Sequence, residues 1–334
     1  MSTARADPGR EVPLTVRRAL RLALADLPAG TTVLLAASGG PDSWALAYTA
    51  ATQHDLRGLR FGLVTVDHGL QPGSAEHARG VAARAAGLGL APVEVAHVRA
   101  AALGAGPEGA ARAARYEALN EAASRHDAGA VLLAHTLDDQ AESVLLGLAR
   151  GSGPRSLSGM RPINGGFRRP FLHLDRDTVH AAIPEGWPRW HDPHNADDAY
   201  ARARVRQRVL PTLERELGPG VAAALARTAD LFRADTEALD AWAERACEQA
   251  QVERDEHASL DVATLLDLPT AVRTRVLRAQ ALRAGCPATE LTAGHIAEID
   301  RLLTDWRGQR GVDLPGPVWA ARAAGRLSMD RPSS

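Results

Sequence analysis

The chain has 334 residues, of which 45% are apolar and 24% charged, a balance typical of globular proteins with two or three domains. The 39 basic residues are all arginine, so no lysine side chain can clamp a phosphate or form a Schiff base. The formal net charge of −1 excludes a global basic signature for nucleic acid, so any such signature has to be local.

The cysteines and the hydropathy pattern exclude further classes of protein. Cys247 and Cys286 lie far apart, which argues against a disulfide framework, a zinc ribbon and an iron–sulfur site. No apolar run approaches the roughly 20 residues of a membrane-spanning helix. The first residues also lack the apolar stretch of a signal peptide. We therefore expect a cytoplasmic protein without a membrane partner.

Short apolar runs alternate with amphipathic segments through the first half of the chain. The runs predict strands at 32–37, 61–66, 92–98 and 131–135. The intervening segments predict helices at 42–51, from 74 onward, at 108–124 and at 138–150. Buried strands alternating with helices form a mostly parallel sheet covered on both faces. We therefore predict a doubly wound α/β domain over residues 1–213.

The second half has a different character. Residues 151–200 are rich in Gly, Pro, Arg and His, which predicts a loop-rich segment. A Pro/Gly cluster predicts a domain boundary near 211–220. Apolar residues then recur at helical spacing, with helices expected from Val221, at 271–284 and at 289–305. We predict a smaller helical domain over 214–334 that ends in a Gly/Pro-rich, hairpin-like tail.

The run Ser38-Gly39-Gly40-Pro41-Asp42-Ser43 follows the first strand and opens a helix. Ligands of open α/β sheets bind at the carboxyl ends of strands, where helix N-termini present free N–H groups. The glycines allow close approach of an anion, the two serine hydroxyls can donate to phosphate, and Asp42 suits a magnesium ion that bridges phosphates. The run is neither a Walker A motif nor GxGxxG. A plain βα turn is the alternative, which so many specified residues disfavour.

This run resembles the signature of the PP-loop (N-type) ATP pyrophosphatases. The resemblance implies an adenine nucleotide alpha hydrolase-like fold that binds ATP with Mg²⁺. It also implies cleavage between the α- and β-phosphates, which leaves an adenylated intermediate for a nitrogen or sulfur nucleophile. The run alone is compatible with GMP, NAD and asparagine synthetases, with tRNA thiolases and with tRNA(Ile)-lysidine synthases.

Four further segments, in the same order, resemble the tRNA(Ile)-lysidine synthases. They are VDHGL at 66–70, EGAARAARYEAL at 108–119, LAHTLDDQAESVLLGLARGSGPRSLSGM at 133–160 and DPHNADDAYARARVR at 192–206. The chain is therefore identified as a member of this family over 32–213, with a helical remainder of similar kind. It departs from the family pattern at Gln71, His194 and Ala203, positions that concern RNA and loop contacts more than the ATP loop.

The resemblance implies a reaction and its partners. The C2 oxygen of wobble cytidine 34, in a tRNA(Ile) with a CAU anticodon, is adenylated by ATP. The ε-amine of free L-lysine then attacks that carbon, giving lysidine, AMP and diphosphate. Residues 38–43 with Asp67 and His68 are expected to bind ATP, Asp42 and Asp139 to bind Mg²⁺, and the C-terminal domain to help hold the tRNA. A homodimer is compatible with this assignment.

Three acidic residues, Asp138, Asp139 and Glu142, open the helix after the fourth strand, and 138 and 142 are one turn apart. Carboxylates at this edge can hold a metal, bind the lysine ammonium or accept its proton. We expect lysine and metal binding jointly. The alternative is that acids in a first helical turn merely favour the helix dipole, worth about 0.3–1 kcal/mol.

Arginines supply the complementary charge. Arg112 and Arg115 share a helix face and could neutralise diphosphate or tRNA phosphates, or simply be solvated. No acidic residue occurs from Ser143 to Leu174, whereas five arginines do. We expect this stretch and the arginines that follow to contact tRNA, with one pair of the 202–208 run facing the site. The residues expected to bind tRNA are Arg150, Arg155, Arg202 and Arg206.

Three other functions remain open. A PP-loop tRNA thiolase needs a catalytic cysteine near the nucleotide or an iron–sulfur site, and both cysteines here fall in the helical part. An NAD or GMP synthetase leaves the arginine-rich stretch unexplained. A catalytically inactive nucleotide- or RNA-binding module is disfavoured by the complete SGGPDS and DDQAE runs.

Overall fold

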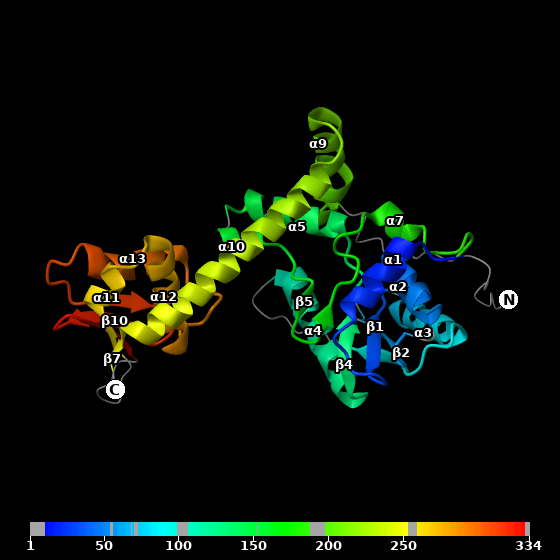
Figure 1. Cartoon of the computed structure of the whole chain (residues 1–334), viewed down its shortest axis with the longest axis horizontal. Coiled ribbons are helices and arrows are strands. Elements are labelled where there is room, and N and C mark those ends of the chain that lie inside the picture. Colours follow the sequence, from blue (N-terminus) through cyan, green and yellow to red (C-terminus); the bar gives the residue numbers. More distant parts are fainter. Residues whose placement is uncertain are drawn as a thin grey trace. The chain divides into compact units, whose positions relative to one another are not determined.

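The computed structural model describes residues 11–330 except 54–55, 68, 70–72, 99–105, 152, 188–197 and 253–258. Its contacts divide the chain into two units, residues 1–232 and 233–334 (Figure 1). We expected the boundary near 211–220, but the first turns of α10 (Val221–Ala250) belong to the first unit. The reason is that Ala222 and Leu225 of this helix pack against a cluster of Ala141, Val205 and Leu210, all residues of the first unit.

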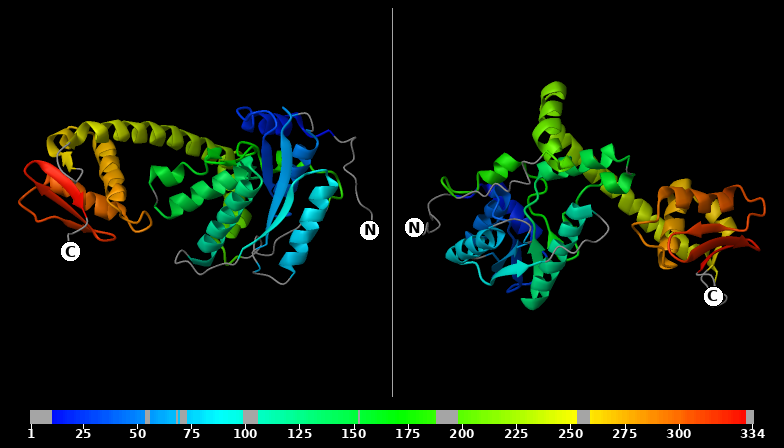
Figure 2. Two further views of the ribbon diagram at one scale, coloured as in Figure 1. Left: turned by 90° about the horizontal axis from the view of Figure 1, so that it is seen from below. Right: turned by 180° about the vertical axis from the view of Figure 1, so that it is seen from behind.

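The first unit is built on a six-stranded sheet in the order β3-β2-β1-β4-β6-β5. Figure 2 shows long blue and light-blue strands of this sheet with the helices that accompany them. Its strands are parallel except β5, which runs antiparallel to β6. The strands are β1 (Thr32–Ala36), β2 (Arg60–Asp67), β3 (Val93–His97), β4 (Ala128–Leu132), β5 (Ile163–Asn164) and β6 (Phe167–Arg168).

Helices precede, connect and follow these strands. They are α1 (Leu14–Ala23), α2 (Pro41–Ala51), α3 (Ser74–Gly87), α4 (Gly106–Arg125), α5 (Leu137–Ala149), α6 (Pro154–Leu157), α7 (Arg176–His180), α8 (Ala201–Arg204), the π-helix η2 (Val205–Val209) and α9 (Leu210–Leu217). The alternation of strand and helix confirms the predicted doubly wound α/β fold.

Strand β1 explains why both faces of the sheet are covered. Val33 and Leu35 point into a core shared with α1, α2, α3 and α7, whereas Leu34 points into a second core shared with α4. All three side chains are buried. Successive residues of a strand face opposite sides, so a continuous apolar run requires two covering layers.

The order of the strands also fixes where a ligand binds. From β1 the chain builds outward through β2 and β3, then returns to place β4 on the other side of β1. This reversal creates a crevice beyond the carboxyl ends of β1 and β4, where open α/β sheets bind their ligands.

One sequence prediction for this unit needs correction and another needs an addition. The fourth strand lies at Ala128–Leu132 rather than 131–135, so Ala134 and His135 belong to the loop that leads into α5. The described part of the segment 151–200 is loop-rich as expected, but the strand β6 within it, which extends the sheet by pairing with β4, was not predicted. Strands of two residues are too short to give an alternating pattern that a sequence reading can detect.

The second unit contains the C-terminal part of α10, α11 (Val262–Leu266), α12 (Thr270–Arg283) and α13 (Ala293–Thr304). A five-stranded sheet in the order β7-β8-β11-β10-β9 accompanies them. Its strands are β7 (Gln251–Val252), β8 (Ser259–Asp261), β9 (Val312–Leu314), β10 (Val318–Ala323) and β11 (Arg326–Asp330).

The expected hairpin-like tail exists as β10 and β11, and the strands β7 and β8, which were not predicted, join the same sheet. Within the described part of the chain, no helix is long and apolar enough to cross a membrane.

Candidate active site

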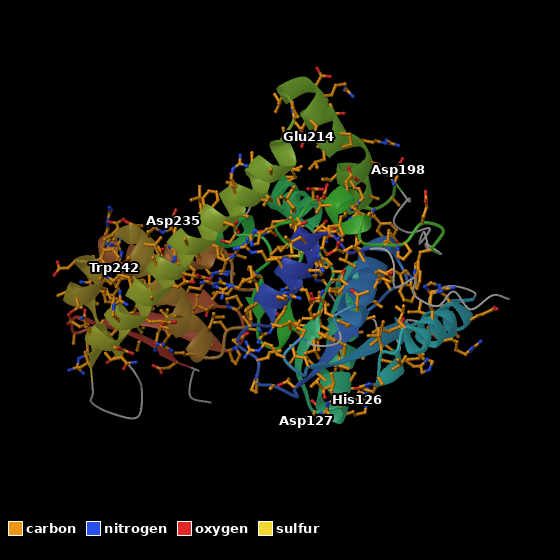
Figure 3. All side chains as sticks on the ribbon, turned by 45° about the vertical axis from the view of Figure 1, so that its right-hand side comes forward. His126, Asp127, Asp198, Glu214, Asp235 and Trp242 are labelled. Atoms are coloured by element: carbon orange, nitrogen blue, oxygen red, sulfur yellow. The ribbon has the colours of Figure 1, made fainter. Side chains whose placement is uncertain are left out.

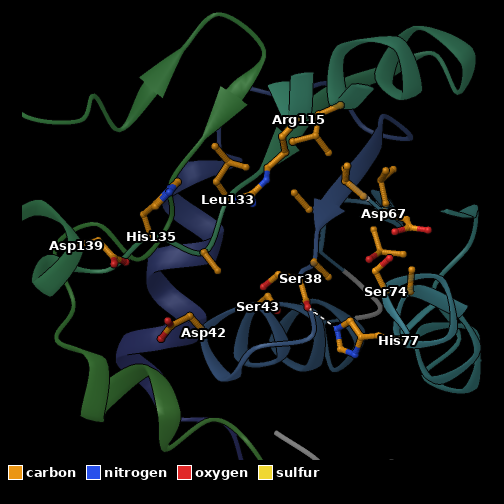
Figure 4. A pocket seen from close by; sticks show the side chains of 18 residues that line it. Ser38, Asp42, Ser43, Asp67, Ser74, His77, Arg115, Leu133, His135 and Asp139 are labelled. Atoms are coloured by element: carbon orange, nitrogen blue, oxygen red, sulfur yellow. Dashed lines mark hydrogen bonds between the residues drawn. The ribbon is translucent and has the colours of Figure 1, made fainter. Parts of the chain in front are cut away.

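A cavity of about 260 Å³ lies beyond the carboxyl ends of β1, β2 and β4 (Figure 4). Asp67, Ser74 and His77 line one side of it, and Asp42, His135 and Asp139 line the other. Apolar side chains of the strands, of the residues that directly follow them and of α4 form the wall between them. These are Ala36, Ala37, Val64, Val66, Leu119, Leu133 and Ala134.

The predicted phosphate loop borders this cavity and opens α2. Gly40 is the N-cap in extended conformation, no side chain caps the helix, and Pro41 stands in its first turn. Ser43 turns its hydroxyl back to the carbonyl of Gly40 at 2.8 Å. The first-turn N–H groups of α2 are therefore without a side-chain cap, which suits an anionic ligand.

Gly39 is required by space as well as by backbone conformation. Its φ is +83°, and a Cβ built on it would lie 2.6 Å from the ring of His77 and 2.8 Å from Val81. The His77 ring stands there because its Nε2 lies 2.8 Å from the carbonyl oxygen of Ser38. This contact joins α3 to the loop and leaves the backbone open toward the cavity (Figure 4).

Asp42 faces the cavity from the first turn of α2. Its Oδ1 lies 2.8 Å from Nε2 of His180 and 4.0 Å from Nε of Arg176, both on α7. Its Oδ2 accepts no hydrogen bond from the residues that the structure describes.

Asp139 and Glu142 form a nearly buried acidic pair on α5, with relative exposures of 7% and 1%. Arg206 of η2 donates from its side chain to Asp139 Oδ1 at 2.7 Å and to Glu142 Oε1 at 2.6 Å. Arg202 of α8 donates to Glu142 Oε2 at 2.9 Å. Buried carboxylates need such partners, because an unpaired buried charge is very costly.

Two arginines four residues apart reach one glutamate. Arg202 lies on α8 and Arg206 on the π-helix η2 that directly follows it, and both side chains turn toward Glu142. π-helical turns are rare and recur at functional sites. The sequence predicted that one pair of the 202–208 run faces the site, and the structure brings Arg202 and Arg206 there. It places them on the acidic pair, and their expected contact with tRNA stays a prediction.

The remaining acid, Asp138, lies at the N-terminus of α5. Its Oδ2 accepts the backbone N–H of Arg176 at 2.8 Å, which ties α7 to α5. Asp139 instead completes a capping box: its Oδ2 accepts the N–H of Thr136 at 2.9 Å. Burial opposes ionisation of Asp139, but the neighbouring His135, followed by Arg206, the Thr136 N–H and Arg176, outweighs it and holds the pKa of Asp139 below its usual value.

Arg176 and His180 are site residues that the sequence analysis missed. Arg176 also extends its guanidinium to within 3.5 Å of both Asp139 and Glu142. The signal available was a basic pair four residues apart, which shares one helix face. That pair lies in a segment of little periodicity, so nothing local indicated a helix.

His135 sits between the acidic pair and the strand ends. Its Nδ1 is buried and has no hydrogen-bond partner among the residues that the structure describes. Burial, reinforced by Arg169, Arg202 and Arg112, lowers its pKa to about 3, against the opposing effect of Asp139. The ring is therefore neutral at physiological pH.

Some of the other predicted site residues line the cavity and some do not. Asp67 is buried at the end of β2, and its Oδ1 accepts the N–H of Gly69 at 3.0 Å. His68 lies outside the described residues. Arg115 lines the cavity, whereas Arg112 does not and stacks over the ring of Tyr116 at 5.2 Å.

The basic stretch is not one continuous exposed surface. Arg150 and Arg155 are exposed at the end of α5 and in α6. Arg168 is buried, where it donates to the carbonyl of Ala23 at 2.7 Å and pairs with Asp26. Arg169 is equally buried. The latter two serve internal contacts, so within this stretch the exposed arginines, Arg150, Arg155 and also Arg161, are the better placed for a partner.

Comparisons with known proteins agree with this geometry. Residues 14–213 match the family model of the PP-loop domain, and residues 260–328 match the TilS substrate binding domain. Curated relatives named tRNA(Ile)-lysidine synthase are similar along most of both chains. The relative from Thermobifida fusca is 58% identical over 93% of this chain and 95% of its own. The relative from Streptomyces coelicolor is 55% identical over 90% of this chain and 86% of its own.

A solved structure carries the same fold. The U34-tRNA thiolase NcsA from Methanococcus maripaludis, with its [4Fe-4S] cluster, aligns with a TM-score of 0.54 and 18% identity, over 65% of this chain and 78% of that chain. The likeness concerns the fold alone. In this chain both cysteines are buried in the second unit, and the described residues contain no group of three His, Cys, Asp or Glu arranged to hold a metal.

Proposed function

The chain belongs to the tRNA(Ile)-lysidine synthase family of PP-loop proteins, and from this premise we propose how its cavity performs the reaction. The C2 oxygen of cytidine 34 attacks the α-phosphorus of ATP, and diphosphate leaves. The ε-amine of L-lysine then attacks C2, AMP leaves with the former C2 oxygen, and the amine gives up a proton. The observation that carries the proposal is one cavity bordered by both the phosphate loop and Asp139, a buried member of the acidic group that opens α5.

ATP would lie along the strand ends. Its phosphates suit the uncapped first turn of α2 and the backbone at Gly39, where the side chain of any other residue would collide with His77 and Val81. The nucleoside of ATP would lie against the apolar wall, on the side of the cavity that Asp67 lines. Arg115, from the opposite helix, is placed to neutralise charge that develops on the leaving diphosphate. Arg112 would act farther out, toward tRNA phosphate.

The carboxylate oxygens at the cavity fit a magnesium ion whose other ligands are mostly oxygens of the ATP phosphates. Magnesium commonly binds one or two carboxylates together with substrate phosphates, rather than a protein cage. Asp42 offers its Oδ2, which accepts no hydrogen bond from the described residues. Asp139 could join only if Arg206 and Arg176 released its Oδ1. When bound, the ion would neutralise phosphate charge and favour departure of diphosphate.

L-lysine would bind at the acidic residues of α5. Asp138 is the most open of them, because its Oδ1 accepts no hydrogen bond from the part of the chain described. Asp139 and Glu142 add negative potential beside it, partly balanced by their arginines. A carboxylate of this group is placed to accept the proton that the amine loses as the C–N bond forms.

The tRNA would approach over α5 and α6. Arg150 and Arg155 are exposed there and suit contacts with backbone phosphates. Arg202 and Arg206 reach the site from α8 and η2, so they suit the nucleotide that enters the cavity. The wobble base has to leave its stack before its C2 oxygen can react.

The test is release of diphosphate by the purified protein from Mg²⁺·ATP, an unmodified tRNA(Ile) transcript with a CAU anticodon, and L-lysine. We expect release to require ATP and the tRNA, and multiple turnover to require lysine. Asp42→Ala should reduce the rate at least tenfold, whereas Asp177→Ala, which removes an exposed acid from the first turn of α7, should not. Release that is independent of the tRNA would contradict the proposal.

A further inference from the structure

Helix α7 is a fixed element between the two halves of the candidate site. Val179 is fully buried in the core that α2 shares, and Ile183 follows it there. Asp175 caps the helix by accepting the N–H of Thr178 at 2.7 Å. The N–H of Leu137, at the start of α5, donates to the carbonyl of Leu174 at 2.9 Å. Packing and hydrogen bonds therefore hold the backbone of α7 in place, and this fixes the positions from which its side chains extend.

His180 reaches from this helix to the phosphate loop. Its Nε2 lies 2.8 Å from Oδ1 of Asp42, a residue 138 positions earlier in the chain. Because an ionised carboxylate only accepts hydrogen bonds, Nε2 carries the hydrogen in this pair. Both side chains are mostly sheltered, with 21% of His180 and 26% of Asp42 exposed. A hydrogen bond to a charged group in such a place is stronger than one in water.

The bond distinguishes the two oxygens of Asp42. The terminal torsion of an aspartate is broad, so a free carboxylate would present either oxygen to the cavity. Here Oδ1 is held by His180, while Oδ2 accepts no hydrogen bond from the residues described. The carboxylate is thereby oriented before a ligand arrives, which lowers the cost of binding.

We propose that His180 is a positioning residue for the phosphate loop: its Nε2–H fixes Oδ1 of Asp42 and so leaves Oδ2 directed to the cation that accompanies the ATP phosphates. This inference rests on the proposed function of the cavity. It assigns a role to a residue that lies outside both the SGGPDS and the DDQAE runs. His180 acts through Asp42 and need not touch a substrate.

A second histidine provides a matched control. His126 follows α4, and its Nε2 lies 2.7 Å from Oε2 of Glu94, with 27% and 21% of the two side chains exposed (Figure 3). The pair has almost the same geometry and burial as His180 with Asp42. Neither of its members lines the cavity of about 260 Å³. Loss of this contact should affect stability but not the use of ATP.

The experiment compares His180→Ala, His180→Gln and His126→Ala in the full-length protein. The first readout is calorimetric binding of a non-hydrolysable ATP analogue over a series of Mg²⁺ concentrations. The second is the KM for Mg²⁺·ATP and for L-lysine in lysidine formation. Thermal melting of each variant reports its stability.

We expect His180→Ala to weaken Mg²⁺-dependent analogue binding and to raise the KM for Mg²⁺·ATP about tenfold or more. The KM for L-lysine should stay within about twofold. The glutamine variant, whose amide donates at similar reach, should restore most of the loss. His126→Ala should leave both binding and KM unchanged.

Binding within twofold of the wild type in His180→Ala, or an equal rise in the KM for lysine, would overturn the inference. If the alanine variant does not fold, the glutamine variant should fold and bind the analogue almost normally, and weak binding by a folded glutamine variant would count against the role. If the wild type binds the analogue with Mg²⁺ but forms no lysidine, the proposed function fails, and the binding series still decides the role of His180.

Discussion

At the scale of single residues, Gly39 makes the phosphate loop possible. Gly39→Ala places a Cβ against His77 and Val81 at a positive φ, so ATP binding should fall at least tenfold, as measured by calorimetry. Gly30→Ala is the matched control, because Gly30 has a φ of +78° but nothing within 4 Å of a Cβ. It should lose about 1 kcal/mol of stability from backbone strain and no affinity. Equal loss of affinity in both variants would refute the role of close approach.

His135 should remain uncharged over the range in which the protein functions. Burial first, and then the neighbouring arginines, lower its pKa to about 3 from an ordinary value of 6.5. Its imidazole should therefore keep the chemical shifts of the neutral form from pH 8 down to about pH 4, where exposed histidines are fully protonated. Histidine-selective NMR, with His135→Asn to identify the signal, measures this. A midpoint near 6.5 would contradict the assignment.

The sequence predicted many of the residues around the cavity but not their pairing. Asp42, Asp67, Arg115 and Asp139 were found because the ends of parallel strands meet at one edge and because their motifs are local. The contact of His180 with Asp42 joins positions 138 residues apart, so only tertiary folding brings it about. Whether each of these residues acts in the reaction is still a prediction.

At the scale of elements, α5 and the helix run from α8 through η2 are joined by the buried ion-pair cluster at Glu142. Glu142→Gln removes the carboxylate charge that pairs with Arg202 and one of the two carboxylates that pair with Arg206. The free energy of unfolding should fall by about 2 kcal/mol or more, measured by denaturant titration. Glu121→Gln breaks an exposed i,i+4 pair with Arg125 and should cost at most about 0.5 kcal/mol. Similar losses in the two variants would contradict the account.

Element prediction succeeded where segments were long and failed where they were short. The helices α3, α4 and α5 and the first three strands lie close to where periodicity and apolar runs predicted them. The two-residue strands β6 and β7 left no pattern, yet β6 extends the main sheet and β7 pairs at an edge of the second. Pairing with a distant strand, rather than local preference, defines such elements.

At the scale of the whole molecule, a net charge of −1 means that attraction to tRNA has to come from local arginines. Replacing Arg150 and Arg155 by alanine should reduce the slope of log affinity against log salt by about 0.7–0.9 per arginine. Replacing the exposed Arg18 and Arg79, on α1 and α3, should not change the slope. Filter binding of the tRNA(Ile) transcript at several salt concentrations measures both. Equal slopes in the two double variants would remove Arg150 and Arg155 from the interface.

The most direct test of the central claim is identification of the product nucleoside. The full-length protein would be incubated with Mg²⁺·ATP, isotopically labelled L-lysine and the CAU-bearing tRNA(Ile) transcript, and the RNA would be digested and analysed by mass spectrometry. We predict that the label is attached to cytidine 34 alone, in amounts that match the diphosphate released, and that Asp42→Ala abolishes both. Diphosphate release without label on the tRNA, or label at another nucleotide, would contradict the claim.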